Sequence, residues 1–170
     1  MTEEIEESSQ RELDALQQRL QAASSPGDIA LCAVNESAAV LEFEQAVLWW
    51  LQPVARRLAM VGSGLPAISD ESPYQQWVAR LVEAITPQPF DQPGTFTLAD
   101  LPETVAAEGV EWFPGVLLHC PVCRPDGLAF GGMLFFRVDA FSDVERALAQ
   151  SIGGATASAL WSAGAMAERP

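Results

Sequence analysis

The chain has 170 residues and a mass of 18.3 kDa, which is about the size of one domain. Hydrophobic residues make up 49% and charged residues 19% of it. This composition is typical of a globular protein and excludes a disordered tail, a collagen-like repeat and a coiled coil. Nine arginines and no lysine stand against 23 acidic residues, for a net charge of −14. No basic stripe is available to neutralise a phosphate backbone, so a nucleic-acid partner is disfavoured.

The cysteines and the N-terminal residues indicate the cellular compartment in which the chain is expected. Cys32, Cys120 and Cys123 form an odd set, and residues 3–7 are mostly acidic, whereas a secretory signal is basic and then apolar. We therefore expect reduced thiols and a cytoplasmic location. No apolar stretch approaches the roughly 20 residues that cross a bilayer, so this segment is expected to make no membrane contact of its own.

Helical patterns open the chain. Residues 2–23 predict a polar helix. Its thin apolar stripe consists of Ile5, Leu13, Leu16 and Leu20. Ser25-Pro26 then supplies an N-cap and a first-turn proline, and the helix that follows is expected over residues 29–43.

Two strands and a third helix come next. Residues 45–51 are short, apolar and aromatic and stop before Pro53, which favours a buried strand. Residues 57–62 are expected to pair back onto it. Ser72-Pro73 repeats the cap-and-proline start of a helix. One face of that helix is apolar and consists of Trp77, Val78, Leu81, Val82 and Ile85.

The stretch from residue 86 to residue 111 is rich in proline and poorly periodic. We predict a long irregular excursion there, with a short strand near residues 95–98. Segments of this length without regular structure are usually lids, binding loops or disorder.

A hairpin and a helix are predicted for the C-terminal third. Residues 115–122 and 127–138 flank Arg124-Pro125-Asp126-Gly127, in which proline presets φ and glycine tolerates a positive φ. The second arm is apolar on both alternating faces, as in a central strand covered on each side. Ser142 and Glu145 form a capping box for the final helix.

In this order the elements predict an α+β domain with a mostly antiparallel central sheet. The N- and C-terminal helices are expected on one face, and a shorter helix plus irregular loops on the other. We divide the chain into an N-terminal polar helix (1–24), one domain (25–163) and a C-terminal tail (164–170).

Four of these features occur in the same order in GAF domains, which the chain resembles over about residues 26–162. They are Ala33-Val-Asn-Glu36 in a helix, Ala46-Val-Leu-Trp49 in a strand, the Ser72-Pro73 helix with Trp77, and Gly127 to Arg137 before a final helix. The resemblance implies a non-catalytic sensory or regulatory domain that binds an unidentified small molecule or mediates dimerisation. It implies no cofactor, and fold analogy alone does not name the ligand.

A narrower resemblance is to the N-terminal GAF-type domains of some haemolysin-D-type (membrane fusion) adaptor proteins of bacterial export systems. Leu117-Leu-His-Cys-Pro121 stands where those domains carry a run of the type Leu-Trp-Leu-Pro-Leu, and the aromatic residue is absent here. The resemblance implies a cytoplasmic part of an inner-membrane protein that continues beyond Pro170.

A ligand pocket is expected between the sheet and residues 86–114. Trp49 and Trp50 are neighbours in one strand, so they point to opposite faces and one of them lines this pocket. We assign this role to Trp50. The ligand-binding residues predicted are Trp50, Trp112, His119 and Arg137. Two alternatives stay open: aromatic side chains fill the space, or Arg137 pairs with a carboxylate instead of a ligand anion.

The cysteines raise two chemical alternatives. His119, Cys120 and Cys123, with Cys32 as a fourth ligand, have the donor types of a zinc site, but a single Cys pair fits small buried side chains better. Some GAF-like proteins are Cys-dependent free methionine sulfoxide reductases, so a redox enzyme is the alternative function. We predict no metal site and no catalytic residue.

Self-association is expected through the terminal helices. The final helix carries a row of small residues, Ala147, Ser151, Gly154 and Ser158, beside an apolar row, Val144, Leu148, Ile152, Ala155 and Ala159. The apolar row is expected to pack on the sheet. The small row is left for the first helix or for a second subunit in a twofold homodimer.

Overall fold

The computed structural model describes residues 2–52, 57–64, 72–85 and 93–164. The elements occur in the order α1 (Thr2–Ala22), α2 (Pro26–Glu36), η1 (Ser37–Ala39), β1 (Gln45–Gln52), β2 (Arg57–Gly62), α3 (Pro73–Ile85), β3 (Gly94–Phe96), η2 (Leu98–Asp100), α4 (Glu103–Gly109), β4 (Val116–Cys123), β5 (Ala129–Arg137) and α5 (Asp143–Ser162). The predicted α+β class is confirmed.

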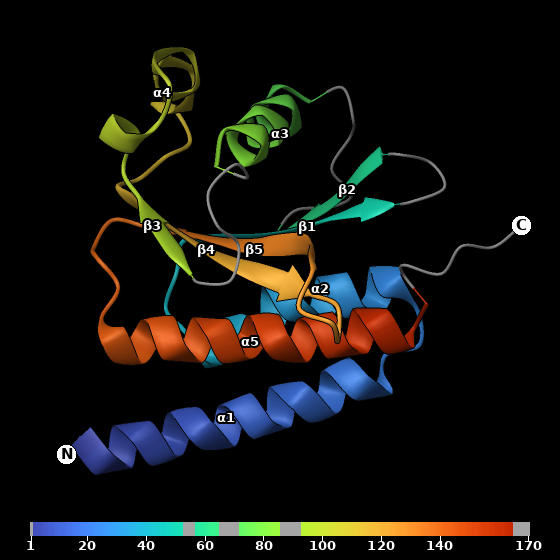
Figure 1. The fold of residues 1–170 in the computed structure, drawn as a ribbon. Coiled ribbons are helices and arrows are strands. Elements are labelled where there is room, and N and C mark those ends of the chain that lie inside the picture. Colours follow the sequence, from blue (N-terminus) through green and yellow to red (C-terminus); the bar gives the residue numbers. More distant parts are fainter. Residues whose placement is uncertain (1, 53–56, 65–71, 86–92, 165–170) are drawn as a thin grey trace, which may run out of the picture.

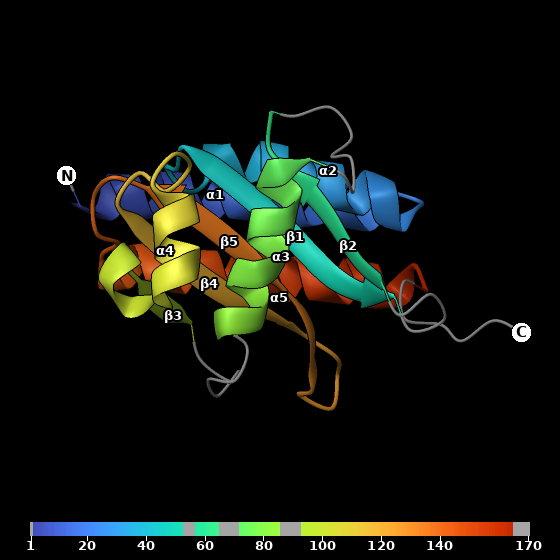
Figure 2. The same ribbon diagram turned by 90° about the horizontal axis from the view of Figure 1, so that it is seen from above.

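The strands form one antiparallel sheet in the order β2-β1-β5-β4-β3. Helices α1, α2 and α5 lie on one side of the sheet, with α5 between the sheet and α1, while α3 and α4 lie on the other side (Figure 1). Seen from above, α3 and α4 cross the strands (Figure 2). We call these two sides the α5 face and the α3 face.

Local signals position most of these elements as predicted. Ser25 Oγ accepts the backbone N–H of Asp28 at 3.1 Å and caps α2. Ser142 and Glu145 form the reciprocal capping box of α5. In the hairpin turn Gly127 has a φ of +90°, a left-handed conformation that glycine adopts without steric cost. Helix α2 ends seven residues earlier than residue 43, because a short 3-10 turn, η1, follows it.

Each face of the sheet has its own apolar core. On the α5 face, α1 contributes Leu13, Leu16 and Leu20, all 3% exposed or less, so the polar N-terminal helix packs into this core. On the α3 face, all five apolar residues predicted for α3 are buried. Strand β5 is buried from Phe130 to Phe136, which confirms a central strand covered on both sides.

Helix α4 corrects the prediction of an irregular excursion over residues 86–111. Trp77 of α3 donates its indole N–H to the carbonyl of Val105 at 2.9 Å, and a Cβ at Gly109 would lie 2.6 Å from the Trp77 ring. Arg80 of α3 pairs with Glu108. The helix is seven residues long and is held by contacts with α3, which a local pattern does not reveal. Residues 86–92 lie outside the described residues.

An ion pair ties the end of β5 to the start of α5. Arg137 makes two hydrogen bonds to the Glu145 carboxylate, at 2.6 and 2.7 Å, and donates to the carbonyls of Glu42, Asp139 and Ala140. Only 11% of the Arg137 side chain is exposed. The hydrogen bonds from Arg137 lower the pKa of Glu145 from 4.5 to about 2.

Replacing Glu145 with glutamine is expected to lower the free energy of unfolding by about 1–2 kcal/mol at pH 7, after allowance for partial solvent exposure. Because the folded-state pKa lies below the unfolded value, the carboxylate stabilises the fold above pH 4.5, and this contribution is lost as the pH falls toward 2. Urea denaturation at several pH values measures the difference. A gap between wild type and Glu145→Gln that does not shrink below pH 4.5 would contradict this assignment.

Candidate functional site

Two aromatic side chains with polar atoms lie together in the apolar layer of the α3 face. Trp49 of β1 and His119 of β4 stack with ring centroids 6.0 Å apart and planes 16° apart. Both side chains are 4% exposed. In the part of the chain that the structure describes, the Trp49 indole N–H is buried without a hydrogen-bond acceptor. Such a group costs about 1–3 kcal/mol to bury, so this pair is the candidate site.

Gly132 of β5 makes room for the pair. A Cβ at this position would lie 2.2 Å from His119 Nε2 and 2.8 Å from Trp49 Nε1. Both rings therefore lie over the backbone of β5. The sequence contained a signal for this arrangement that our prediction did not use, because glycine inside a strand often marks a close approach.

His119 is neutral in this environment. Burial lowers the pKa of its imidazole from 6.5 to about 4, since the surrounding apolar layer disfavours the charged form. At neutral pH the site therefore presents an indole donor and an uncharged imidazole. Such groups suit a ligand with hydrogen-bonding atoms on a largely apolar body.

The prediction that Trp50 lines a pocket on the α3 face is wrong. The two tryptophans point to opposite sides, as expected, but Trp50 packs into the core under α1, α2 and α5, whereas Trp49 faces α3. The alternation of a strand predicts that neighbours diverge but not which one faces which layer. Trp49 takes the place that we assigned to Trp50.

Trp112 lies on the α3 face but is engaged with other rings. It contacts Tyr74 edge-on at a centroid distance of 5.6 Å and Trp77 at 5.6 Å. Next to it, Phe113 is buried against Phe136. Aromatic packing therefore occupies the described part of the predicted roof around Trp112.

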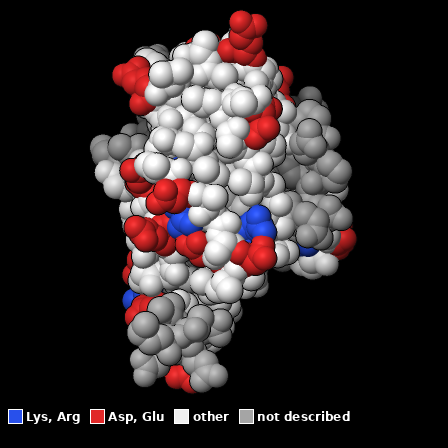
Figure 3. Space-filling view, turned by 90° about the vertical axis from the view of Figure 1, so that its left-hand side faces the viewer, with Lys and Arg blue, Asp and Glu red and all other residues white. Residues whose placement is uncertain are grey.

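Arg137 points to the α5 face and is fully engaged with Glu145 and three carbonyls, so carboxylate pairing is the alternative that the geometry favours. A hollow of about 460 Å³ beside it is lined by Glu42, Glu44, Asp139 and Glu145, among others. Among the charged side chains at this end of the molecule, acidic ones predominate (Figure 3). Such surroundings disfavour a ligand anion.

The cysteines do not converge with His119. Cys120 follows His119 in β4 and so faces α5, where it is buried. Burial raises the pKa of the Cys120 thiol to about 12, and burial with a hydrogen bond to Glu36 raises that of Cys32 to about 12. Among the described residues no group of three or more metal-ligating side chains occurs. Raised thiol pKa values disfavour the nucleophilic thiolate.

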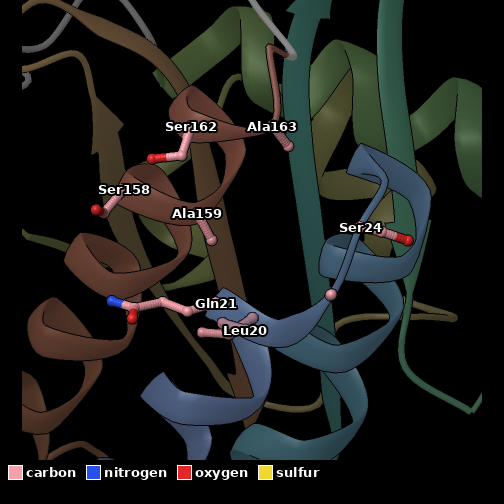
Figure 4. Close-up of a pocket in the computed structure, with 8 residues that line it drawn as sticks. Leu20, Gln21, Ser24, Ser158, Ala159, Ser162 and Ala163 are labelled. Atoms are coloured by element: carbon pink, nitrogen blue, oxygen red, sulfur yellow. The ribbon is translucent and has the colours of Figure 1, made fainter.

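Other hollows lie along α5. One of about 490 Å³ separates the C-terminal ends of α1 and α5 (Figure 4). Its lining is small or polar: Leu20, Gln21, Ala23, Ser24, Ser158, Ala159, Ser162 and Ala163. It contains no ionisable side chain, and it lies across the sheet from Trp49. No helix among the described residues is both long and apolar enough to cross a membrane.

Replacing Gly132 with alanine is expected to lower the free energy of unfolding by about 1–3 kcal/mol, because the new methyl group must displace both rings. Chemical denaturation measures the loss. Gly27→Ala is the matched control, since only Ser25 Oγ at 4.0 Å comes near its new Cβ. Equal stabilities for the two variants would argue against the close approach at Gly132.

Replacing His119 with leucine is expected to weaken the pH dependence of the free energy of unfolding in the acid range. Between pH 6.5 and 4 the unfolded chain binds a proton at His119 that the folded chain does not, so wild-type stability falls with pH. Because of His119, the free energy of unfolding of the wild type should be about 2–3 kcal/mol lower at pH 4.5 than at pH 7. Denaturation midpoints of both proteins at these pH values test it. Identical slopes would mean that His119 titrates normally.

Comparison with known proteins bears on the fold. No protein-family model and no curated protein matches the chain. Among solved structures, an N-acylhomoserine lactone dependent LuxR-family transcription factor from Burkholderia cenocepacia matches with a TM-score of 0.67 at 16% identity, over 92% of this chain and 98% of its own. The GAF domain of a phosphoenolpyruvate-protein phosphotransferase from Coxiella burnetii matches with a TM-score of 0.62 at 17% identity, over 92% and 94%.

A methyl-accepting chemotaxis protein fragment also matches, with a TM-score of 0.64 at 14% identity, over 88% of this chain and 96% of its own. At these identities the matches show the fold alone. The narrower resemblance to haemolysin-D-type adaptor proteins stays a prediction. The chain has the fold of a GAF domain.

Proposed function

We propose that this chain is a non-catalytic sensory or regulatory domain that binds a small molecule on the α3 face, with Trp49 as a hydrogen-bond donor to it. The observation that carries the proposal is the buried Trp49 N–H, which has no acceptor among the described residues. A ligand oxygen or nitrogen would satisfy that donor and recover the cost of burying it. Neutral His119, stacked on the same ring, would be the second polar contact.

The fold supports this assignment by analogy. Proteins of similar fold include a fragment of a methyl-accepting chemotaxis protein and a transcription factor described as dependent on N-acylhomoserine lactone. Both names indicate regulation by a signal. Because fold does not imply function, the argument rests on the Trp49 site, and the analogy suggests which ligands to test first.

The redox alternative receives less support from the residues. Cys120 and His119 point to opposite faces of β4, and the thiol pKa values of Cys32 and Cys120 are raised to about 12. A Cys-dependent reductase needs a thiolate at neutral pH. A role in an export-system adaptor rests on sequence resemblance alone.

Thermal-shift screening with N-acylhomoserine lactones and cyclic nucleotides tests the ligand proposal. A ligand should raise the melting temperature of the wild type, and Trp49→Phe, which keeps a ring but removes the N–H, should weaken its binding about tenfold. Trp50→Phe is the matched control, because it makes the same change on the opposite face. Equal binding by wild type and Trp49→Phe would refute the role of Trp49, and no binding by any compound would count against the proposal.

A further inference from the structure

Helix α3 covers the part of the sheet that carries the Trp49 site. It lies above the sheet and crosses β1 and β5 (Figures 1 and 2), and its buried face belongs to the same apolar cluster as Trp49. Trp49 and His119 are each 4% exposed, and the indole nitrogen of Trp49 is buried. A ligand therefore reaches this donor only after part of the cover has moved away from the sheet.

Helix α4, the second element of this cover, is anchored to the sheet on both sides along the chain. Before it, β3 pairs with β4 through Thr95 and Leu118, and Leu101 is buried in the apolar layer. After it, Phe113 is 6% exposed and packs edge-on against Phe136 of β5, with ring centroids 5.7 Å apart. Because both flanks are tied to the sheet, α4 is expected to stay in place when the cover opens.

Helix α3 faces the sheet with apolar side chains. Each of them is 5% exposed or less, and they are Trp77, Val78, Leu81, Val82 and Ile85. Apolar burial is non-directional, so it holds the helix over the sheet without fixing it at one point. Directional contacts therefore decide where α3 is fixed.

Three contacts with α4 supply that fixation. Trp77 is fully buried and donates its indole N–H to the carbonyl of Val105 at 2.9 Å. The same ring lies against Gly109, where a Cβ would be 2.6 Å from it. On the outer side of the helix, Arg80 pairs with Glu108. We call these three contacts the α3–α4 clasp.

We propose that α3 is a lid over Trp49 and that the α3–α4 clasp holds it closed. The site opens when Trp77 leaves Val105 and α3 lifts from the sheet, while α4 stays in place. Such an opening is a local event with a lower free energy than global unfolding. The inference rests on the proposed function only in taking Trp49 as the group that a ligand must reach.

Hydrogen exchange of the Trp49 indole N–H, followed by NMR, measures the opening without any ligand, so the proposed function can fail and leave this test intact. The resonance is identified by its absence from Trp49→Phe. In the wild type its protection factor should be at least about tenfold smaller than those of the β5 backbone amides, which exchange only on global unfolding. Equal protection factors would show that no lid opens, and an unprotected indole N–H would show that α3 does not close the site. Either result would overturn the proposal.

Two variants test the clasp. Trp77→Phe removes the N–H that Val105 accepts, and Gly109→Ala places a methyl group against the Trp77 ring. Each should lower the protection factor of the Trp49 N–H at least about tenfold, because the closed state loses a contact that the open state lacks. Gly109→Ala keeps every native side chain and replaces a poor helix former with a good one, so it tests the clasp even if Trp77→Phe fails to fold.

Ile152→Val is the matched control on the opposite face. Ile152 of α5 is fully buried in the core of the α5 face, so its truncation should speed exchange of the β5 amides about tenfold. The lid opening leaves that core intact, so the protection factor of the Trp49 N–H should stay within about twofold of the wild type. Unchanged protection of Trp49 in both clasp variants would show that α3 and α4 move together. A tenfold loss in Ile152→Val would show exchange by global unfolding. Each of these outcomes contradicts the lid.

Discussion

A sheet whose middle strand is apolar on both faces must be covered twice, and the rest of this structure depends on that constraint. Strand β5 is buried from Phe130 to Phe136, and side chains of successive residues point to opposite layers. One layer of helices cannot shield both sets, so the chain builds α1, α2 and α5 on one face and α3 and α4 on the other (Figure 1). The ion pair between Arg137 and Glu145 then fixes where the chain leaves this strand and enters α5.

Short sequence patterns predicted those elements whose position depends only on neighbouring residues. The caps at Ser25 and Ser142 and the turn at Gly127 act within a few residues, so their sequence patterns located α2, α5 and the hairpin. Helix α4 depends on contacts with Trp77, which lies 28 residues before Val105 in the chain. A seven-residue helix has little stability of its own, so its sequence shows no strong periodicity and the prediction of irregular structure was wrong there.

Only part of the candidate site was predictable, because the site also depends on contacts between residues far apart in the sequence. His119 was singled out because it is the one histidine of the chain, and the structure buries it beside Trp49. Strand alternation separated Trp49 from Trp50 but left the choice of face undetermined, since that choice depends on which helices cover which side. The close approach at Gly132 involves three strands, β1, β5 and β4, and only their register brings the two rings together over one glycine.

The Trp49 site and helix α5 lie on opposite faces of the sheet, and strand β4 contacts both. His119 points to the α3 face, while its neighbour Cys120 points to α5, where a Cβ at Gly153 would lie 3.5 Å from Cys120 Cβ and 3.3 Å from the carbonyl of Pro121. A ligand that moves His119 would therefore move backbone that packs directly against α5.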